Sequence, residues 1–425
     1  MNSMSVWEAT ANERPKRPVL QGEKTCDVVI VGGGFTGLSV AYHLQQRNVD
    51  TVVLEKGVVG GGASGRNGGE VLIGYVESMR SLAKKYGRDA ARQMFQMSLD
   101  SIDLIERIIQ EEDIACDFQR NGNLLAAYKP SHLDDLKREQ QFLYEAYQFE
   151  SKIVEKEDLH TELDSSFYHG AFVDERSAIF HPLNYCLGLA KAVERRGGTI
   201  YEHSQATKIE RVTPDKVIVE THNGRVVAKQ VGLFVNAYTT GLHDVIDRAI
   251  VPVESIVLAT EPLPHALCQQ LIKHNRAASD TKRLLYYFRR TADNRMVFGG
   301  SGRTASKRDA RSLFDKLREG MVTVFPALKD AKVEYKWSGK VGFTFERIPY
   351  IGQLEDGTHF AFGYAGHGAA MSTLLGKLVA LNMLNEGDRH NPLDRSRLKP
   401  IPFHSQHARA VGIMKYYFKF LDYIS

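Results

Sequence analysis

The sequence predicts an α/β fold that begins with a parallel sheet, and three observations predict it. An apolar run over 28–31 leads into a glycine-rich turn, a helical segment follows that turn, and a second apolar run covers 51–54. This pattern is typical of a βαβ unit that binds a dinucleotide. Gly32 allows the sharp turn after the first strand, Gly34 allows the backbone to approach a pyrophosphate, and Gly37 allows the helix to pack closely on the strands. The first part of the chain is therefore expected to be a Rossmann-like nucleotide-binding unit.

Glu55 stands directly after the second apolar run, where the second strand should end. A carboxylate in this place can accept hydrogen bonds from both hydroxyls of an adenosine ribose, and it disfavours the 2′-phosphate of NADP. The alternative interpretation is a glycine-rich turn without a ligand. The order of strand, glycines, helix, strand and acid favours the nucleotide site.

A second glycine-rich stretch covers 59–69 and contains Ser64, Arg66 and Asn67. Its glycine content excludes a regular element, and main chain without Cβ atoms can lie against a flat ligand. The alternative is a flexible surface loop. An arginine between glycines, placed directly after a nucleotide-binding unit, favours contact with a cofactor.

Beyond this stretch, apolar residues at spacings of three and four predict helices over 79–110 and 133–149. These helices interrupt the alternation of strand and helix, which an NAD dehydrogenase would usually continue here. Further helices are predicted over 183–196, after His181-Pro182, and over 312–324. Short β-branched or aromatic runs predict strands over 199–201, 206–212, 216–220, 226–229, 231–235, 249–260, 284–289, 295–299, 335–345 and 349–352.

A third glycine-rich turn, at 363–368, lies between a strand-like run over 360–362 and a helix-like run over 369–380. It should therefore present a second helix N-terminus to the ligand site. The aromatic tail over 414–424 is predicted to be a helix that packs on the body of the protein. A helix that lies on a membrane surface is the alternative.

Composition bounds the class of protein. The chain has 425 residues, enough for two packed domains. Its net charge is +4, and its Lys and Arg are dispersed among nearly as many acids. This distribution argues against a basic stripe that binds nucleic acid or a membrane. Its four cysteines form no CxxC or Cys/His group, so we expect no metal site and a reducing compartment. Residues 1–26 read as an extended lead without a signal peptide, and the chain has no run of about eighteen apolar residues. A soluble, cytoplasmic protein is expected, with its oligomeric state left open.

Several blocks of the sequence, in one order, resemble a known family: the FAD-dependent amine and amino-acid oxidoreductases of the D-amino-acid oxidase type, which include sarcosine oxidase and glycine oxidase. The resemblance covers nearly the whole chain. The blocks that carry it are 7–10, Ala63-Ser64-Gly65-Arg66-Asn67-Gly68-Gly69, Asn236-Ala237-Tyr238, 259–263, Tyr287-Phe288-Arg289, 347–349 and Gly366-His367-Gly368.

The resemblance implies an FAD-binding, Rossmann-like domain of the glutathione-reductase type and an α+β substrate domain with a mixed sheet. It divides the chain into an N-terminal extension over 1–26, a discontinuous FAD-binding domain, a substrate domain with a helical excursion, and a C-terminal tail helix over 401–425. The FAD-binding domain would comprise 27–78, 150–248 and 336–400, and the substrate part 79–149 and 249–335. No cysteine lies beyond Cys268, where the sarcosine oxidases attach their flavin, so the FAD is expected to be bound non-covalently.

The resemblance also assigns cofactor contacts. Gly32, Gly34 and Gly37 would meet the pyrophosphate, Glu55 the ribose and Ala206 the adenine, while Ser64, Arg66, Asn67 and Gly68 would border the isoalloxazine, and Gly366, His367 and Gly368 would lie by its N1 and C2 carbonyl. Phe35, Thr36, Lys56, Ala63 and Asn236 are further expected contacts. Reduction leaves negative charge near N1, which a helix start carrying His367 can stabilise. A histidine that only caps the helix is the alternative for His367.

His367, Arg66, Tyr287 and Arg289 are the predicted catalytic residues, the last two as walls of the substrate pocket. Tyr286 should point to the other face of the same strand. Tyrosines in such strands often serve only in packing. His181 and Tyr364 are additional candidates.

Two departures from the family bear on the reaction. The sarcosine oxidases hold the substrate carboxylate with a lysine two residues after the Gly-His-Gly block, where this chain has Ala370. An unpaired, desolvated carboxylate is costly there, which favours an amine whose reacting carbon bears no carboxylate. The lysine that speeds reaction with oxygen aligns with Val297, so oxygen is a less firm expectation than the flavin.

The resemblance implies oxidation of the C–N bond of an amine of the gamma-glutamylputrescine kind, which yields an aldehyde, ammonia and, with O2 as acceptor, hydrogen peroxide. One alternative is a D-amino-acid or secondary-amino-acid dehydrogenase that passes electrons to a quinone or carrier protein. Others are a flavin-bound sensor or assembly protein without turnover, and an NAD dehydrogenase.

Overall fold

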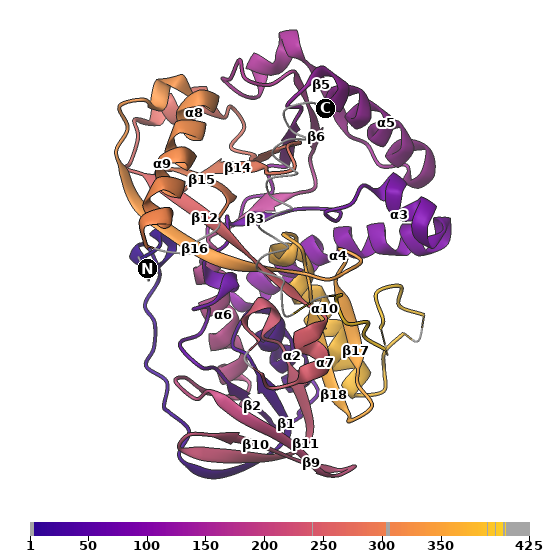
Figure 1. Ribbon diagram of the computed structural model, residues 1–425. Helices are drawn as coiled ribbons and strands as arrows, with labels where there is room; N and C mark the ends of the chain where they lie inside the picture. The colour runs from indigo at the N-terminus through magenta and orange to yellow at the C-terminus, as the bar shows by residue number, and fades with distance from the viewer. Residues whose placement is uncertain are drawn as a thin grey trace.

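The structure is a computed structural model, and it describes residues 4–239, 241–302, 307–388, 390–395, 397–402 and 404. The chain forms two large sheets, and Figure 1 shows the first in the lower half of the molecule and the second in the upper half. The predicted α/β architecture with mixed sheets is confirmed.

The first sheet has the order β17-β18-β11-β1-β2-β8, and β9 and β10 extend it beside β11. β1 pairs in parallel with β2 and β11, and β2 with β8, as expected of a nucleotide-binding sheet. Every residue of α2 is buried, because this helix packs against β1, α6 and α10. The elements are β1 (Gly22–Val31), α2 (Phe35–Gln45), β2 (Thr51–Leu54), α6 (Pro182–Arg195), β8 (Thr199–Tyr201), β9 (Ala206–Thr213), β10 (Lys216–Thr221), β11 (Gly224–Leu233), β17 (Tyr350–Gln353), β18 (Thr358–Phe362) and α10 (Gly368–Met383).

The second sheet has the order β16-β12-β15-β14-β13-β4-β6-β5, and its pairs are antiparallel except β13 with β4. A separate apolar core under α8 and α9 includes Phe288, Phe298 and Phe325. The elements are β4 (Asn123–Ala126), β5 (Lys152–Glu155), β6 (Gly170–Asp174), β12 (Val251–Thr260), α8 (His265–Leu271), β13 (Ala277–Asp280), β14 (Tyr286–Arg290), β15 (Met296–Ser301), α9 (Lys307–Val324) and β16 (Val333–Phe343).

A two-stranded ribbon and several helices complete the described fold. β3 pairs with β7 immediately after the second glycine-rich stretch, and β3 also packs against α10. The remaining elements are α1 (Val6–Ala9), η1 (Ala63–Gly65), β3 (Glu70–Val71), α3 (Met79–Tyr86), α4 (Arg88–Glu112), α5 (Pro130–Tyr147), η2 (Lys156–Thr161), β7 (Ala178–Ile179), η3 (Asn236–Tyr238), α7 (Asp244–Arg248) and η4 (Pro326–Leu328).

Three predicted elements were wrong in detail. The single helix over 79–110 is two helices, α3 and α4, because Gly87 between them has φ of 88°. The two strands predicted over 226–229 and 231–235 form one strand, β11. The extended lead over 1–26 contains α1, whose start is fixed by a reciprocal capping box between Ser5 and Glu8, and β1 already begins at Gly22.

The strand pairing also departs from the expected domain boundaries. β5 and β6 pair in the second sheet, although 150–248 was assigned to the nucleotide-binding part. All of β16 likewise belongs to the second sheet, although 336–400 is expected in the FAD-binding part. The division into domains stays a proposal. The tail helix predicted over 401–425 lies outside the described residues, apart from 401, 402 and 404.

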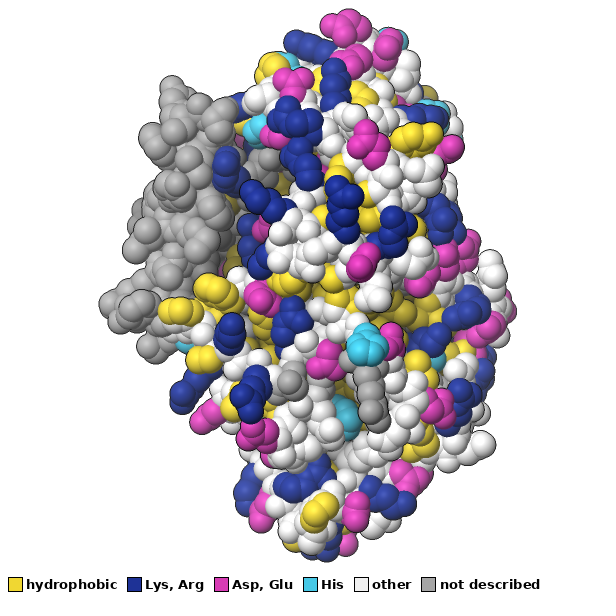
Figure 2. Space-filling view, turned by 90° about the vertical axis from the view of Figure 1, so that its right-hand side faces the viewer, with side chains coloured by type: hydrophobic (Ala, Val, Ile, Leu, Met, Phe, Trp, Pro, Cys, Tyr) yellow, Lys and Arg dark blue, Asp and Glu magenta, His cyan; other side chains and the backbone are white. Residues whose placement is uncertain are grey.

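The described helices include none with the length and apolar character needed to cross a membrane. Figure 2 shows one face of the molecule, on which Lys and Arg side chains are interspersed with Asp and Glu over both halves.

Candidate active site

The first glycine-rich turn joins β1 to α2 in a conformation that only glycine allows. Gly32 has φ of 115°, and a Cβ on it would lie 2.6 Å from the carbonyl oxygen of Phe234. A Cβ on Gly37 would overlap the carbonyl oxygen of Gly32, so α2 packs directly on the end of β1. The N–H groups in the first turn of α2 have no partner within the helix, which makes this end a site for an anion.

Glu55 and Ser64 hold this turn from outside. The two carboxylate oxygens of Glu55 accept hydrogen bonds from the N–H groups of Gly33 and Gly57, each at 2.8 Å. Ser64 Oγ accepts one from the N–H of Phe35 at 3.0 Å. Glu55 is therefore fixed at the end of β2, and a carboxylate retains further lone pairs that hydroxyls can use.

The second glycine-rich stretch is held by two tryptophans. Trp7 Nε1 donates to the carbonyl of Asn67 at 2.7 Å, and Trp337 Nε1 donates to that of Arg66 at 2.9 Å. Arg66 Nε in turn donates to the carbonyl of Ser338 at 2.8 Å, and its Nη1 lies 3.3 Å from Glu8. These bonds tie the loop to α1 and β16, so the alternative of a flexible surface loop is wrong.

The third glycine-rich turn lies beside the first one. Thr36 at the start of α2 shares a hydrogen bond of 2.7 Å with the hydroxyl of Tyr364. Ala365 and Gly366 have φ of 51° and 103°, and a Cβ on Gly366 would meet nothing within 4 Å. The main chain at Gly366 therefore borders open space at the N-terminus of α10.

His367 precedes α10 with its imidazole half-buried. Its side chain makes no capping hydrogen bond, and its Nδ1 is buried with no partner among the described residues. Burial lowers the pKa of His367 to about 4, so the ring is neutral near pH 7. The alternative in which His367 only caps the helix is therefore not supported.

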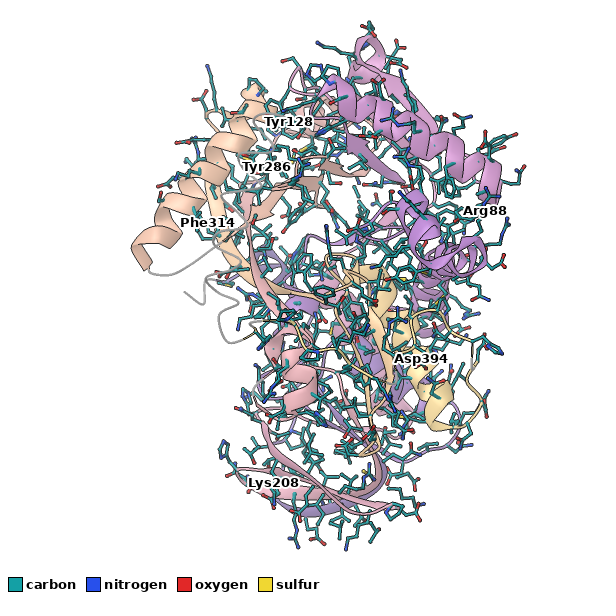
Figure 3. The ribbon with its side chains drawn as sticks, turned by 45° about the vertical axis from the view of Figure 1, so that its right-hand side comes forward. Arg88, Tyr128, Lys208, Tyr286, Phe314 and Asp394 are labelled. Carbon is teal, nitrogen blue, oxygen red and sulfur yellow. The ribbon has the colours of Figure 1, made fainter. Side chains whose placement is uncertain are left out.

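Tyr287 of β14 packs on the second glycine-rich stretch. A Cβ on Gly68 would lie 2.9 Å from its ring, and the ring also lies against Gly299. Its hydroxyl shares a hydrogen bond of 3.0 Å with Ser255. Tyr286 points the other way, as predicted, with its hydroxyl against Gly320 of α9 (Figure 3).

Arg289, on the same strand, is 2 % exposed. Its Nη1 donates to the carbonyls of Gly69 and Phe180 at 2.7 and 2.6 Å, and its guanidinium lies 5.4 Å from the Trp7 ring. Burial lowers the pKa of Arg289 to about 10, so it remains charged at neutral pH. Arg289 thus anchors the glycine-rich stretch to the segment that follows β7.

The other candidates are more scattered. Asn236, with φ of 43°, accepts a hydrogen bond from the N–H of Gly363 at 3.0 Å, which joins η3 to the third turn. Lys56 lies over the Tyr238 ring at 5.1 Å, Ala63 lies in η1, and Ala206 begins β9. His181 caps α6 through Nδ1 and shares a hydrogen bond with Thr10 through Nε2, which ties α6 to the N-terminal segment.

The sequence reasoning missed Glu70. This residue begins β3, directly after Gly69, and its Oε1 is buried with no hydrogen-bond partner among the described residues. Burial raises the pKa of the Glu70 carboxyl to about 8, although the charge of Arg289 opposes the shift. An acid that immediately follows a glycine-rich cofactor loop was the only available signal.

A flavin adenine dinucleotide fits the residues that converge here. Two helix N-termini, the Glu55 carboxylate and main chain at Gly366 that faces open space suit a dinucleotide with a flat ring. The unpartnered Nδ1 of His367 is a polar group that such a ring can satisfy. In the described part of the chain, no group of three or more His, Cys, Asp or Glu is placed to hold a metal ion.

Comparisons with known proteins agree with this fit. Residues 27–381 match the family model described as DAO, FAD dependent oxidoreductase. The chain is 34% identical over 415 residues to gamma-glutamylputrescine oxidoreductase of Escherichia coli K12, which covers 95% of this chain and 96% of the relative. It is also 34% identical over 427 residues to the probable oxidoreductase OrdL of Haemophilus influenzae, which covers 98% of this chain and 97% of the relative.

Solved structures show the same fold. Glycine oxidase from Geobacillus kaustophilus superposes with a TM-score of 0.71 at 20% identity, covering 86% of this chain and 96% of that one. An L-amino acid deaminase from Proteus vulgaris superposes with a TM-score of 0.72 at 19% identity, covering 90% and 96%. The chain therefore belongs to the DAO family and is an FAD-dependent oxidoreductase.

Proposed function

We propose that this enzyme oxidises the C–N bond of a primary amine of the gamma-glutamylputrescine kind to an imine, which water hydrolyses to an aldehyde and ammonia, and that oxygen accepts the electrons to give hydrogen peroxide. The similarity to gamma-glutamylputrescine oxidoreductase over nearly the full length of both chains supports the substrate class. The observation that carries the choice of an amine over an amino acid lies in the first turn of α10.

That turn offers no cation for a substrate carboxylate. Its residues, from Gly368 to Met371, include no lysine or arginine, and Ala370 is buried. The nearby guanidinium of Arg289 already donates through Nη1 and Nε to main-chain carbonyls. A carboxylate on the reacting carbon would lose its hydration without a lysine or arginine in this turn to pair with, which costs far more than burying a CH₂ group. A capped diamine avoids this cost.

In this proposal the protein binds and orients the substrate, and a bound flavin would supply the oxidising power as a hydride acceptor. Gly32, Gly34 and Gly37 would hold the pyrophosphate, Glu55 the ribose and Ala206 the adenine. Ser64, Arg66, Asn67 and Gly68 would border the ring, with Gly366, His367 and Gly368 at its N1 side. The neutral imidazole of His367 would donate a hydrogen bond there, because an N–H directed at developing negative charge stabilises it.

Two further parts of the proposal concern attachment and location. The flavin is held without a covalent bond to cysteine, since none lies beyond Cys268. The enzyme works in the reducing cytoplasm, since all four cysteines are free.

A second candidate is a dehydrogenase that passes electrons to a quinone or carrier protein. It is favoured by Val297, which is fully buried and lies opposite Arg289 in β14, at the place where a lysine would be expected to speed reaction with oxygen. For this candidate, D-amino acids or secondary amino acids would be the substrates.

The test is anaerobic reduction of the purified holoenzyme, followed by absorbance of the flavin. Gamma-glutamylputrescine should bleach the flavin, and putrescine, sarcosine, glycine and D-alanine should do so at least about a hundredfold more slowly. Readmission of air should release one hydrogen peroxide per flavin. Bleaching by amino acids alone would contradict the proposed substrate. Reoxidation by a quinone, but not by air, would select the dehydrogenase.

A further inference from the structure

We propose that Glu70 is the substrate-binding carboxylate of this site: it binds the ammonium group of the amine and takes a proton from it through Oε1. The proposal rests on the proposed function, because it assumes an amine that arrives as its cation. The amine must lose a proton before its neighbouring carbon can give up a hydride, because the nitrogen lone pair stabilises the iminium that forms.

The first observation is the position of Glu70. It begins β3 immediately after the loop formed by Asn67, Gly68 and Gly69, and β3 packs against α10. A Cβ on Gly68 would lie 3.7 Å from the carboxyl carbon of Glu70 and 2.9 Å from the ring of Tyr287. The carboxyl and the aromatic ring therefore meet beside the loop that we expect to border the flavin.

The second observation is the unpartnered oxygen of the Glu70 carboxyl. Oε1 of Glu70 is buried, and no donor among the described residues reaches it. Buried carboxylate oxygens are normally hydrogen-bonded, and an exception at a cofactor site points to a ligand. An ammonium group supplies three donors and the opposite charge. A neutral alcohol supplies one weaker donor and no charge.

The surrounding charges make the proton transfer feasible. Arg289 and Tyr287 of β14 are the titratable groups that act on Glu70, β7 places the apolar Ile179 opposite it, and His367 at the start of α10 is neutral. Burial raises the pKa of Glu70 to about 8, within about two units of an alkylamine. In the transfer an N–H bond breaks, an O–H bond forms on Oε1, and the lone pair stays on nitrogen. No electrons leave the substrate in this step.

The experiment measures binding without turnover. Two ligands are titrated into the FAD-loaded enzyme, and dissociation constants are read from the change in flavin absorbance. The first is the gamma-glutamylputrescine analogue with two methyl groups on the reacting carbon, which keeps the ammonium but has no hydrogen to lose. The second is the analogue in which a hydroxyl replaces the amine. The wild-type enzyme should bind the amine at least about tenfold more tightly than the alcohol, the scale of a charged hydrogen bond.

The variant Glu70→Gln should bind both ligands alike, and Glu70→Asp should keep part of the preference. Glu139→Gln is the matched control, because Glu139 also has a raised pKa and an unpartnered buried oxygen but lies in α5, with its other oxygen bound to the N–H of Met79. Its ligand preference should equal that of the wild type.

The pH dependence supplies a second readout. Below pH 8 the Glu70 carboxyl of the free enzyme and the amine group of the free ligand each carry a proton. The complex holds only one of these two protons, so binding releases the other. The affinity of the wild type for the amine should therefore rise from pH 6 to pH 8 and level off, while that of Glu70→Gln should stay flat.

The possible failures are distinguishable. A Glu70→Gln enzyme that keeps the preference for the amine overturns the role of Glu70 and leaves the proposed function in place. A wild-type enzyme that binds neither ligand, while an amino acid bleaches its flavin, overturns both.

Discussion

At the residue scale, the site depends on a few positions at which no other residue type would serve. Gly32 and Gly37 are fixed by backbone atoms that a Cβ would strike. Glu55 holds two main-chain N–H groups at once. These constraints are local, which is why the glycine pattern alone identified them.

Gly37→Ala tests the closest of these contacts. The added methyl would overlap the carbonyl oxygen of Gly32 and push α2 away from β1. We expect a loss of about 1–3 kcal/mol in the free energy of unfolding and protein that is purified with little FAD. The measurements are urea denaturation and the ratio of flavin to protein absorbance. Gly57→Ala is the control, because the nearest atom lies 3.7 Å from its Cβ position, and it should retain FAD.

At the element scale, short segments distant in sequence hold the glycine-rich loops. The N-terminal segment reaches the second loop through Trp7 and Glu8, and Arg17 then pairs with Glu194 of α6 at 2.6 Å. β14 holds the same loop through Arg289. An element of only four residues, α1, thereby forms part of the site.

Trp7→Phe tests the contribution of α1. The change keeps an aromatic ring beside Arg289 but removes the donor to the carbonyl of Asn67. We expect FAD to dissociate about threefold to tenfold faster, as one lost hydrogen bond of about 1 kcal/mol would produce. The release of FAD is monitored through the rise in flavin fluorescence. Unchanged release would show that the loop keeps its conformation without this bond.

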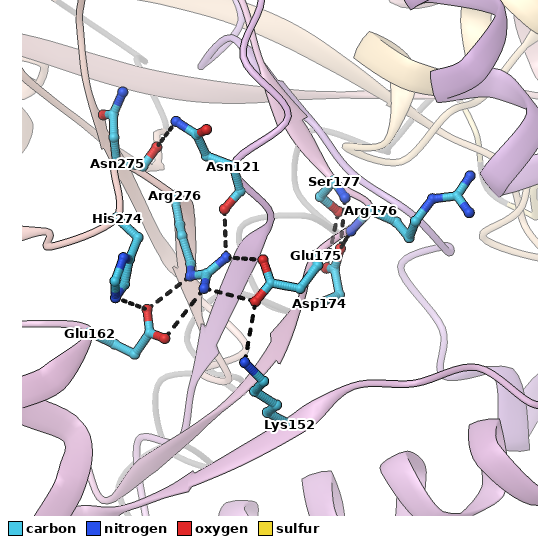
Figure 4. Close-up of polar contacts among 10 residues, drawn as sticks. All are labelled: Asn121, Lys152, Glu162, Asp174, Glu175, Arg176, Ser177, His274, Asn275 and Arg276. Atoms are coloured by element: carbon cyan, nitrogen blue, oxygen red, sulfur yellow. Dashed lines mark hydrogen bonds and ion pairs between the residues drawn. The ribbon is translucent and has the colours of Figure 1, made fainter.

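A second prediction at this scale concerns the ion-pair cluster around Arg276 (Figure 4). Arg276 donates to Glu162, to Glu175 and to the carbonyl of Asn121. Its side chain is 7% exposed and that of Glu162 10%, so Arg276→Met should leave the buried carboxylate of Glu162 with only the exposed His274, at 4.0 Å, as a partner. The expected loss in the free energy of unfolding is about 3 kcal/mol, measured by urea denaturation.

Lys208→Met is the control for this variant. The ion pair of Lys208 with Glu210 is exposed on β9, so its loss should leave the denaturation midpoint unchanged. Equal effects of the two variants would show that burial does not set the strength of these pairs.

At the scale of the whole molecule, buried histidines should make stability depend on pH. Burial lowers the pKa values of His43, His181, His359 and His367 to about 4. Each folded-state pKa lies below the unfolded value of about 6.5, so the unfolded chain binds more protons between these values. Stability should therefore fall as the pH drops from about 6.5 towards 4. Asp174 and Asp280, with pKa values raised to about 6, act in the opposite direction over part of this range.

His359→Gln isolates one histidine of this set. His359 is buried in β18 beside Gln353 and away from the glycine-rich turns. The variant should lose less stability than the wild type when the pH is lowered from 7 to 5, by about 2 kcal/mol. Urea denaturation at the two pH values measures the difference. An equal loss in both proteins would contradict a lowered pKa for His359.

The sequence by itself determined the βαβ unit, the positions of β2 and β8, the cofactor and the family. Glycine spacing and apolar periodicity are local properties, and they follow from backbone sterics and strand burial within a few residues. It did not reveal that Gly87 breaks the long helix, because single glycines also occur within helices and the sequence does not show that φ is positive here. Nor did it reveal that β5 and β6 join the second sheet, because strand partners are chosen by contacts far along the chain. Only the tertiary structure brought Trp7 and Arg289 to the second glycine-rich loop and left the neighbouring Glu70 with an unpartnered, buried oxygen. Burial and charge pairing depend on what the folded chain places around each group.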